Sequence, residues 1–372
     1  MLWSFNIGRI AGTAVRIHIT FVLFLAWIWG ASYVTGGAAA AWSGLLFMVL
    51  LFLCVLLHEF GHIFTARVFG VQTPDVTLLP IGGVARLERI PEEPGQEFLI
   101  AIAGPLVNVA IALFLILFVG ADLSAERLAA VENAQVSMVD RLAAVNLFIA
   151  VFNLIPAFPM DGGRILRSLL ALRVGFTRAT EVSASIGQWV AFALGFIGLF
   201  TNAMLIFIAI FVYLAASSEA QLVAVRAMSR GVPLTAAMMT QYATLAPEAH
   251  IDHAIDTLLR TSQADFPVVD ADGRLLGLLG RNDMIRALKT LGPEARVAEA
   301  MIADVPVLDR RRTLDEAFTL LQQKQAPAVG VTGQDGRLIG LITLETIGEM
   351  LMVREALPSG GRAGPWGRPA GA

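Results

Sequence analysis

Long apolar runs separated by short polar segments fill the first 216 residues of the chain. Four of these runs each supply the roughly 20 mainly apolar residues that a membrane-spanning helix needs, and they cover residues 17–35, 42–69, 98–120 and 141–158. A fifth run, residues 185–216, is too long for one helix and is interrupted at Thr201-Asn202, which predicts a tight hairpin of two spans. The pattern therefore predicts about six transmembrane helices.

After Ser217 the apolar runs give way to the mixed pattern of a soluble domain, and this part of the chain repeats itself. Residues 272–277 (DGRLLG) match residues 335–340 (DGRLIG) at an offset of 63 positions. The first copy predicts a helix at 251–260, strands at 266–270 and 275–279, and a helix at 282–288, with equivalents over 314–350. Because Asp-Gly pairs favour tight hairpin turns, each copy is predicted to be a small α/β unit.

The two patterns together predict an α-helical polytopic membrane protein followed by an α/β module of two tandem repeats. The tail is rich in Gly, Pro and Arg and has no apolar period, so we expect it to be disordered. The predicted limits are 1–216 for the membrane domain, 217–234 for a linker, 235–293 and 294–353 for the two repeats, and 354–372 for the tail.

Composition and charge support a membrane protein and indicate its orientation. The chain is 56% hydrophobic and 15% charged, whereas ordinary soluble domains carry about 25% charged residues. Arginines gather on one side of the predicted spans, which by the positive-inside rule places both termini and the repeats in the cytoplasm. These arginines are Arg9, Arg67, Arg86, Arg89, Arg164, Arg167, Arg173, Arg178, Arg226 and Arg230, against Arg127 in the opposite loop.

The same composition bears on partners and source. A net charge of -3 without a long basic run speaks against nucleic acid binding. A single cysteine, Cys54, provides no disulfide framework, which fits a reducing cytoplasm or a bilayer. Usage rich in Arg and Ala and poor in Lys suggests a bacterium with a GC-rich genome.

The strongest chemical signal is the sequence HEFGH at residues 58–62. His58 and His62 are four residues apart and so lie on one helix face, where a single zinc ion can take both imidazoles. Glu59 lies beside them and can act as the general base of a metalloprotease. Placing an ionisable side chain within a membrane span costs at least about 2.5 kcal/mol and usually marks a functional site. A shared metal ion would explain why three such side chains lie within five residues.

A catalytic zinc site has three protein ligands, so a third is expected elsewhere in the chain. The other candidate cluster within the membrane is NLIPAFPMDGG, residues 153–163, at the end of the fourth predicted span. Asp161 in this cluster is the predicted third ligand. Irregular backbone at membrane depth is tolerated where it lines a cavity, which suits both this segment and the Gly-Gly pair at residues 82–83.

HEFGH together with NLIPAFPMDGG resembles the site-2 proteases, intramembrane zinc metalloproteases of regulated intramembrane proteolysis. Two weaker segments, IGGV at 81–84 and AGPLVN at 103–108, fit the same family, and the resemblance covers residues 1–216. It implies one zinc per chain held by His58, His62 and Asp161, Glu59 as the catalytic base, and Asn153 as a polar helper near the substrate. The implied substrate is a single-span membrane protein, cut within or near its transmembrane segment.

The two repeats resemble a pair of CBS domains, which often bind adenine nucleotides between paired repeats. The family's ribose-binding pattern is Gly, two apolar residues, Thr or Ser, two further residues and Asp. Residues 277–283 keep the acid, Asp283, without the hydroxyl, and residues 340–346 keep the hydroxyl, Thr343, without the acid. The resemblance implies a cytoplasmic module that regulates the protease or gates its substrate, with or without a nucleotide, and that can also form a homodimer.

Three alternatives compete with the protease hypothesis. A CBS-containing transporter or channel could use the intramembrane His and Glu residues for ion binding, but it predicts ionisable groups spread along a pathway and repeated halves. A di-iron enzyme needs a second Glu-x-x-His pair, which the sequence lacks. An inactive relative would typically have lost a ligand or the base, and all four residues are present.

Overall fold

The computed structural model describes residues 3–80, 82–85, 91–124 and 136–356, and two compact units divide the chain at Val223 and Ala224. The predicted disordered tail lies largely outside the described residues, as do Ile81 and three arginines used to infer orientation, Arg86, Arg89 and Arg127.

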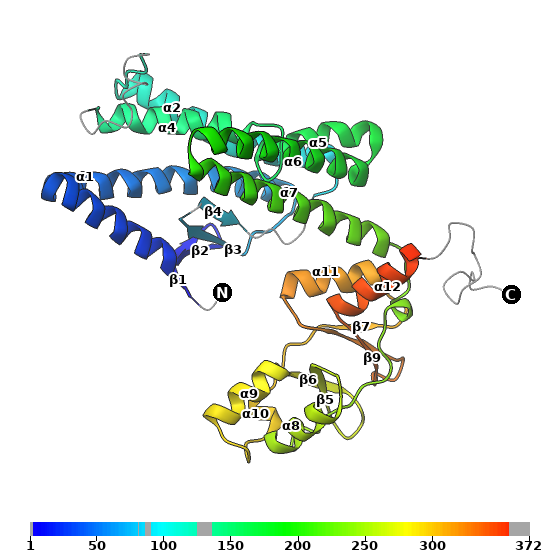
Figure 1. Ribbon diagram of the computed structural model, residues 1–372. Coiled ribbons are helices and arrows are strands. Elements are labelled where there is room, and N and C mark those ends of the chain that lie inside the picture. Colours follow the sequence, from blue (N-terminus) through cyan, green and yellow to red (C-terminus); the bar gives the residue numbers. More distant parts are fainter. Residues whose placement is uncertain (1–2, 81, 86–90, 125–135, 357–372) are drawn as a thin grey trace. The chain divides into compact units, whose positions relative to one another are not determined.

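The first unit is mainly helical (Figure 1). Its helices are α1 (Ile19–Val68), α2 (Pro94–Phe118), α4 (Met138–Asn153), α5 (Asp161–Val174), α6 (Phe176–Phe200) and α7 (Ala203–Ser229). Four of the described helices, α1, α2, α6 and α7, are long and apolar enough to cross a membrane.

Helix α1 contains both of the first two predicted spans. Its 50 residues bend at Gly37, whose φ of 74° lies in the left-handed region that glycine tolerates best. Aromatic side chains from the two arms then meet, with ring centroids 4.5 Å apart for Phe21 and Phe52 and 6.0 Å apart for Trp29 and Trp42. The two arms therefore form a hairpin.

The predicted fourth span, residues 141–158, does not form as one helix. Helix α4 ends at Asn153 and has 16 residues, a length of about 24 Å against a bilayer core of about 30 Å. Pro156 and Pro159 follow, and proline cannot continue a helix. The chain then enters α5, a separate helix that the apolar pattern did not predict, and the count of six spans stays a prediction.

The predicted hairpin in residues 185–216 is confirmed. Helix α6 ends at Phe200 and α7 begins at Ala203, with Thr201 and Asn202 between them. A hydrogen bond from Gln188 Nε2 to Ser217 Oγ, 3.0 Å long, joins the two helices.

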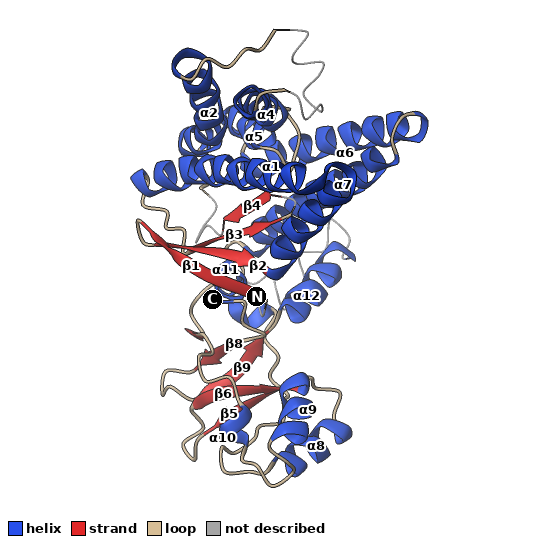
Figure 2. Cartoon of the chain, turned by 90° about the vertical axis from the view of Figure 1, so that its left-hand side faces the viewer, coloured by secondary structure: helices blue, strands red, loops and turns tan. Residues whose placement is uncertain are grey.

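A four-stranded sheet, which the apolar pattern did not predict, accompanies the helices. Its strands, in spatial order, are β1 (Ser4–Ile10), β2 (Thr13–His18), β3 (Asp75–Leu79) and β4 (Gly82–Ala85). The β2 and β3 strands pair in parallel and the outer pairs are antiparallel. Val15 and Val76 pack on Phe60 and Ile63 of α1, which places the sheet alongside that helix (Figure 2). Strand β4 is an edge strand.

The second unit contains the two predicted repeats. The first has α8 (Ile251–Arg260), β5 (Asp265–Val269), β6 (Leu275–Gly280) and α9 (Arg281–Thr290), and the second has α11 (Leu314–Lys324), β8 (Val329–Thr332), β9 (Leu338–Ile342) and α12 (Leu344–Ala356). The predicted helix, strand, turn, strand, helix order is confirmed in both copies. Three further elements are η1 (Leu234–Ala236), α10 (Val297–Ala300) and β7 (Val307–Asp309).

The two repeats are interlaced by the segments that precede and follow the first one. Met239 pairs with Leu341 of the second repeat, and Ile302 returns to pair with Leu278 of the first. Leu278 and Leu341 share one buried cluster with Ala328. The module is therefore stabilised as a pair.

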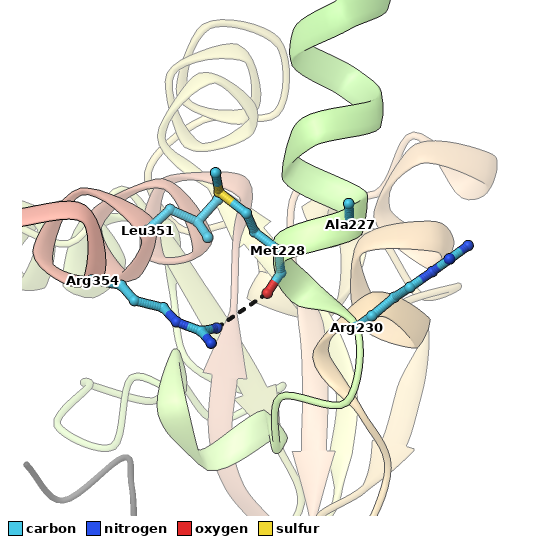
Figure 3. Close-up of a pocket in the computed structure, with 5 residues that line it drawn as sticks. All are labelled: Ala227, Met228, Arg230, Leu351 and Arg354. Atoms are coloured by element: carbon cyan, nitrogen blue, oxygen red, sulfur yellow. Dashed lines mark hydrogen bonds between the residues drawn. The ribbon is translucent and has the colours of Figure 1, made fainter. Parts of the chain in front are cut away.

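The last part of α7, from Ala224, belongs to the second unit, and within this unit a pocket of about 280 Å³ lies between the end of α7 and α12 (Figure 3). The Arg354 guanidinium donates to the Met228 carbonyl across 3.3 Å. Since the last carbonyls of a helix have no partner within it, Arg354 caps α7.

Candidate metal centre

The three predicted zinc ligands meet in the first unit. His58 and His62 lie one turn apart on α1 with their Nε2 atoms 3.1 Å apart. Asp161, the first residue of α5, places its Oδ2 atom 3.2 Å from His58 Nε2 and 3.3 Å from His62 Nε2. All three residues are buried, with 5 to 8% of their surface exposed.

The spacing of these three atoms fits zinc. A tetrahedral zinc with bonds of about 2.0 Å holds its ligand atoms about 3.3 Å apart, close to the 3.1 to 3.3 Å found here. The Asp161 Oδ2 atom is buried and accepts no hydrogen bond from the described residues. Burial of a carboxylate oxygen in this way is costly in free energy unless a cation binds it. Within the described part of the chain, this is the one group of His, Cys, Asp or Glu residues found suitable for a metal.

The outer nitrogens of both histidines are also held. His62 Nδ1 lies 2.7 Å from the Ile100 carbonyl of α2, and His58 Nδ1 lies 2.5 Å from Asn108 Oδ1 of the same helix. A carbonyl oxygen can only accept, so each Nδ1 carries the proton and each Nε2 keeps a lone pair for a metal. Partners of this kind fix the orientation and basicity of metal-binding histidines.

Two glycines allow α1 and α2 to approach closely enough for these contacts. A Cβ atom on Gly61 would lie 2.8 Å from the Ala103 carbonyl oxygen, and one on Gly104 would lie 2.2 Å from His62 Nε2 and 2.7 Å from His58 Nε2. Gly104 therefore leaves open the space next to the ligand atoms. A side chain there would fill the metal cradle.

Asp161 is positioned by the irregular segment between α4 and α5. This segment folds back on α5, because Cβ atoms on Gly162 and Gly163 would lie 2.2 Å from the Ile155 carbonyl oxygen and 2.5 Å from the Phe158 nitrogen. Asp161 thereby stands in the first turn of α5, where the helix dipole favours a carboxylate. The double glycine and the prolines, which the sequence pattern placed near the metal, are what bring the third ligand to α1.

Glu59 lies beside the ligand cluster and against strand β4. A Cβ atom on Gly83 would lie 2.7 Å from Glu59 Cγ, so the strand passes directly over this side chain. Both histidines and Asp161 lie within electrostatic range of the Glu59 carboxylate, as does Arg164 of α5. The predicted base therefore lies between the metal ligands and an edge strand.

Asn153, the predicted polar helper, is half-buried at the last position of α4. Its Nδ2 atom donates to the Ile149 carbonyl one turn earlier, across 3.1 Å. Among the hydrogen bonds of the described residues, none joins Asn153 to a predicted ligand. Its role near the substrate stays a prediction.

In the second unit, Asp283 is the third residue of α9 and Thr343 directly precedes α12, so Thr343 corresponds to Gly280 of the first repeat and Asp283 to Thr346 of the second. The Thr343 hydroxyl accepts from the Thr346 backbone N–H across 3.2 Å and so caps α12. Asp283 lies 3.3 Å from Arg286 and near Asp265, since a Cβ atom on Gly280 would touch both acids. Burial, followed by the Asp283 carboxylate, raises the pKa of Asp265.

Sequence reasoning underrated one neighbour of the metal ligands and missed another. The sequence pattern places Asn108 within AGPLVN without assigning it to the site, and it assigns no role to Asn146 on α4. Both are fully buried. The available signal was an amide inside an apolar span, where polar side chains seldom lack a partner.

Comparisons with known proteins identify the family of each part of the chain. The model of peptidase family M50 matches residues 46–125 and 119–194, and that of the CBS domain matches 234–290 and 297–351. A zinc metalloprotease of Methanocaldococcus jannaschii is 35% identical over 75% of this chain and 79% of its own length. Rip3 of Mycobacterium tuberculosis is 29% identical over 93% of this chain and 92% of its own.

A solved structure, the site-2 protease from Methanocaldococcus jannaschii, is 36% identical, covers 59% of this chain and 95% of its own, and has a TM-score of 0.42. The identity and coverage of the first relative, together with the family matches, are sufficient to assign the family. The chain therefore belongs to peptidase family M50, the site-2 proteases, as a zinc metalloendopeptidase with a C-terminal pair of CBS domains.

Proposed function

We propose that this protein cleaves peptide bonds within or near the transmembrane segments of single-span membrane proteins, in regulated intramembrane proteolysis. The observation that carries the proposal is the position of Glu59, between a triad with the ligand spacing of zinc and an edge strand. Family membership removes the basis for the transporter alternative.

The predicted roles follow from the chemistry of peptide hydrolysis. His58, His62 and Asp161 would hold one zinc ion, which when bound supplies Lewis acidity that makes water a nucleophile near neutral pH and polarises a carbonyl. Glu59 takes the proton from the attacking water and passes it to the leaving amine. Asn153 is proposed to contact the substrate backbone near the cut.

Strand β4 offers a place for the substrate. A helical substrate hides its carbonyls in its own hydrogen bonds, so it must unwind before it can be cut. An unwound segment can add as a further strand to the edge of β4 that pairs with no other described strand, which brings its backbone next to Glu59. We expect cleavage of transmembrane segments with helix-breaking residues near the cut, and equal cleavage of a rigid poly-Leu segment would contradict this route.

The four long apolar helices support a multi-pass location in the cell membrane. With the predicted six spans, the arginine distribution places both termini and the CBS pair in the cytoplasm, in a bacterial cell. The proposed domain limits are those predicted from the sequence, with the two CBS repeats at 235–293 and 294–353.

The CBS pair is proposed to regulate the protease or to gate its substrate. If it binds an adenine nucleotide, Asp283 is the residue most suited to the ribose, because a carboxylate accepts from both hydroxyls. The adjacent Asp265 disfavours a phosphate at this place. Thr343 is the weaker candidate, since its hydroxyl already caps α12. A homodimer through the CBS pair is a further proposal.

Zinc content tests the central claim without knowledge of the substrate. Detergent-purified wild type should hold about one zinc per chain, and His58→Ala and Asp161→Ala should each lose it. Glu59→Gln should keep the zinc and lose cleavage in a screen of single-span substrates. A metal-free wild type would refute the proposed function.

Nucleotide binding has its own test. The full chain should show an increased melting temperature with AMP, ADP or ATP, and Asp283→Ala should abolish the increase. No shift with any of the three in the wild type would favour a ligand-free regulatory or dimerisation module.

A further inference from the structure

A continuous line of hydrogen bonds leads from His58 to helix α4. His58 Nδ1 lies 2.5 Å from Asn108 Oδ1, Asn108 Nδ2 donates to Asn146 Oδ1 across 2.8 Å, and Asn146 Nδ2 donates to the Leu142 carbonyl across 2.8 Å. Asn108 and Asn146 have no exposed surface, so water does not compete for these bonds. Three helices, α1, α2 and α4, contribute to the line.

The end of the line determines the direction of every bond in it. A backbone carbonyl can only accept, so the Leu142 oxygen requires the NH₂ group of Asn146. The Asn146 oxygen then faces Asn108 and requires the NH₂ group of that side chain. The Asn108 oxygen in turn faces His58 and requires a proton on Nδ1. The bonding pattern itself thus fixes both amide orientations, which are otherwise hard to assign.

The consequence for His58 is a single tautomer. With the proton on Nδ1, the Nε2 atom keeps its lone pair and points at the other two ligand atoms. If the Asn108 amide turned over, its NH₂ group would face Nδ1 and favour the tautomer with the proton on Nε2. That tautomer cannot bind a metal through Nε2.

His62 provides an internal comparison. Its Nδ1 atom donates directly to the Ile100 carbonyl of α2, an acceptor that cannot turn over. His58 instead meets a side-chain amide, which can present either its oxygen or its nitrogen. Only His58 therefore needs a second group to hold its partner in place.

We propose that Asn146 is a positioning residue for the metal centre, which acts through Asn108 to hold His58 in its metal-binding tautomer. This inference rests on the proposed zinc site. It goes beyond an ordinary bond between membrane helices, because such a bond would stabilise the bundle without any specific effect on metal affinity.

A double-mutant cycle on the full-length protein in detergent tests the inference, with zinc affinity measured by competition against a chelator. Asn108→Leu should weaken zinc binding about 10- to 100-fold, as expected for the loss of a partner of a metal-binding histidine. Asn146→Leu should weaken it about tenfold, at the low end of that range. In the Asn108→Leu background, Asn146→Leu should have no further effect, because no amide remains to be oriented.

Two further variants separate positioning from general damage. Asn146→Asp should restore most of the affinity, because a protonated carboxyl donates to Leu142 and accepts from Asn108 in the same directions as the amide. Gln188→Leu is the matched control, since it removes an interhelical bond to Ser217 that reaches no metal ligand. It should leave zinc affinity unchanged.

The outcomes distinguish this inference from the proposed function. A wild type without zinc would overturn both. A wild type with one zinc whose affinity is unchanged by Asn146→Leu, or lowered equally in both backgrounds, would overturn the positioning role of Asn146 alone.

Discussion

Gly104→Ala adds one methyl group to α2 and tests the metal centre directly. The new Cβ atom would lie 2.2 Å from His62 Nε2, 2.5 Å from His62 Cε1 and 2.7 Å from His58 Nε2. Movement of α2 away from α1 is opposed by the hydrogen bonds that join Ile100 and Asn108 of α2 to the two histidines. The two imidazole rings must therefore move.

The required movement exceeds what a zinc site tolerates. Cβ atoms are essentially never found closer than 3.0 Å to such neighbours, so His62 Nε2 must retreat by about 0.8 Å. Ligand distances in zinc sites stay within about 0.2 Å of their ideal values. His62 cannot move this far and remain a ligand together with His58 and Asp161. We expect zinc affinity to fall at least about 100-fold, or about 2.7 kcal/mol.

The assay is zinc affinity of the purified full-length protein, with Gly95→Ala as the control. Gly95 lies in the first turn of the same helix and has no atom within 4 Å of its would-be Cβ, so its variant should bind zinc as the wild type does. Wild-type affinity in Gly104→Ala would show that the cradle next to the histidines is not the metal position.

Three further predictions concern interactions away from the ligands. Arg167→Met leaves the buried Glu97 carboxylate without its cation, which should cost about 3 to 5 kcal/mol and reduce folded protein, and a second change, Glu97→Gln, should recover most of it. Because the pKa of Asp265 is raised, its favourable contribution to folding stability is present below the ordinary carboxyl pKa of 3.8 and is lost as the pH rises through the pKa of the folded state. Asp265→Asn should therefore slow amide exchange in β5 at pH 8, with a smaller difference from wild type at pH 4. Arg354→Ala removes the bond to the Met228 carbonyl. It should lower the free energy of opening of the last turn of α7 by less than about 1 kcal/mol, and so speed amide exchange there.

The ligand set could be predicted from the sequence because its geometry is largely local. The histidine pair needs only one helical turn, and the cost of ionisable groups in an apolar span made a shared metal the simplest reason for it. Asp161 is remote from the histidines in sequence, but it belongs to NLIPAFPMDGG, the other candidate cluster within the membrane. The two repeats were equally accessible, since their similarity and their Asp-Gly turns are visible without tertiary contacts.

The rest depends on packing that the pattern does not contain. The apolar run 141–158 suggested one span, but the two prolines end α4 and free the segment that folds back under α5. Strands β1 and β2 pair locally, but β3 pairs with β2 from about 60 residues away, and the apolar pattern contains no sign of that long-range pairing. Asn146 carries no signal of its partner, since that partner lies on another helix.

The metal centre finally depends on the register of two helices. Ile100, Gly104 and Asn108 are spaced four residues apart on α2, and rows with this spacing form ridges on a helix surface. His58 and His62 form the matching row on α1: Ile100 meets His62, Asn108 meets His58, and Gly104 leaves room between them. A one-residue shift of α2 would rotate this row by about 100° and remove all three contacts together. The HEFGH sequence thus becomes a zinc site only against this face of α2. AGPLVN, weak as a motif by itself, contains both Asn108, which holds His58 in place, and Gly104, which leaves room for the two rings.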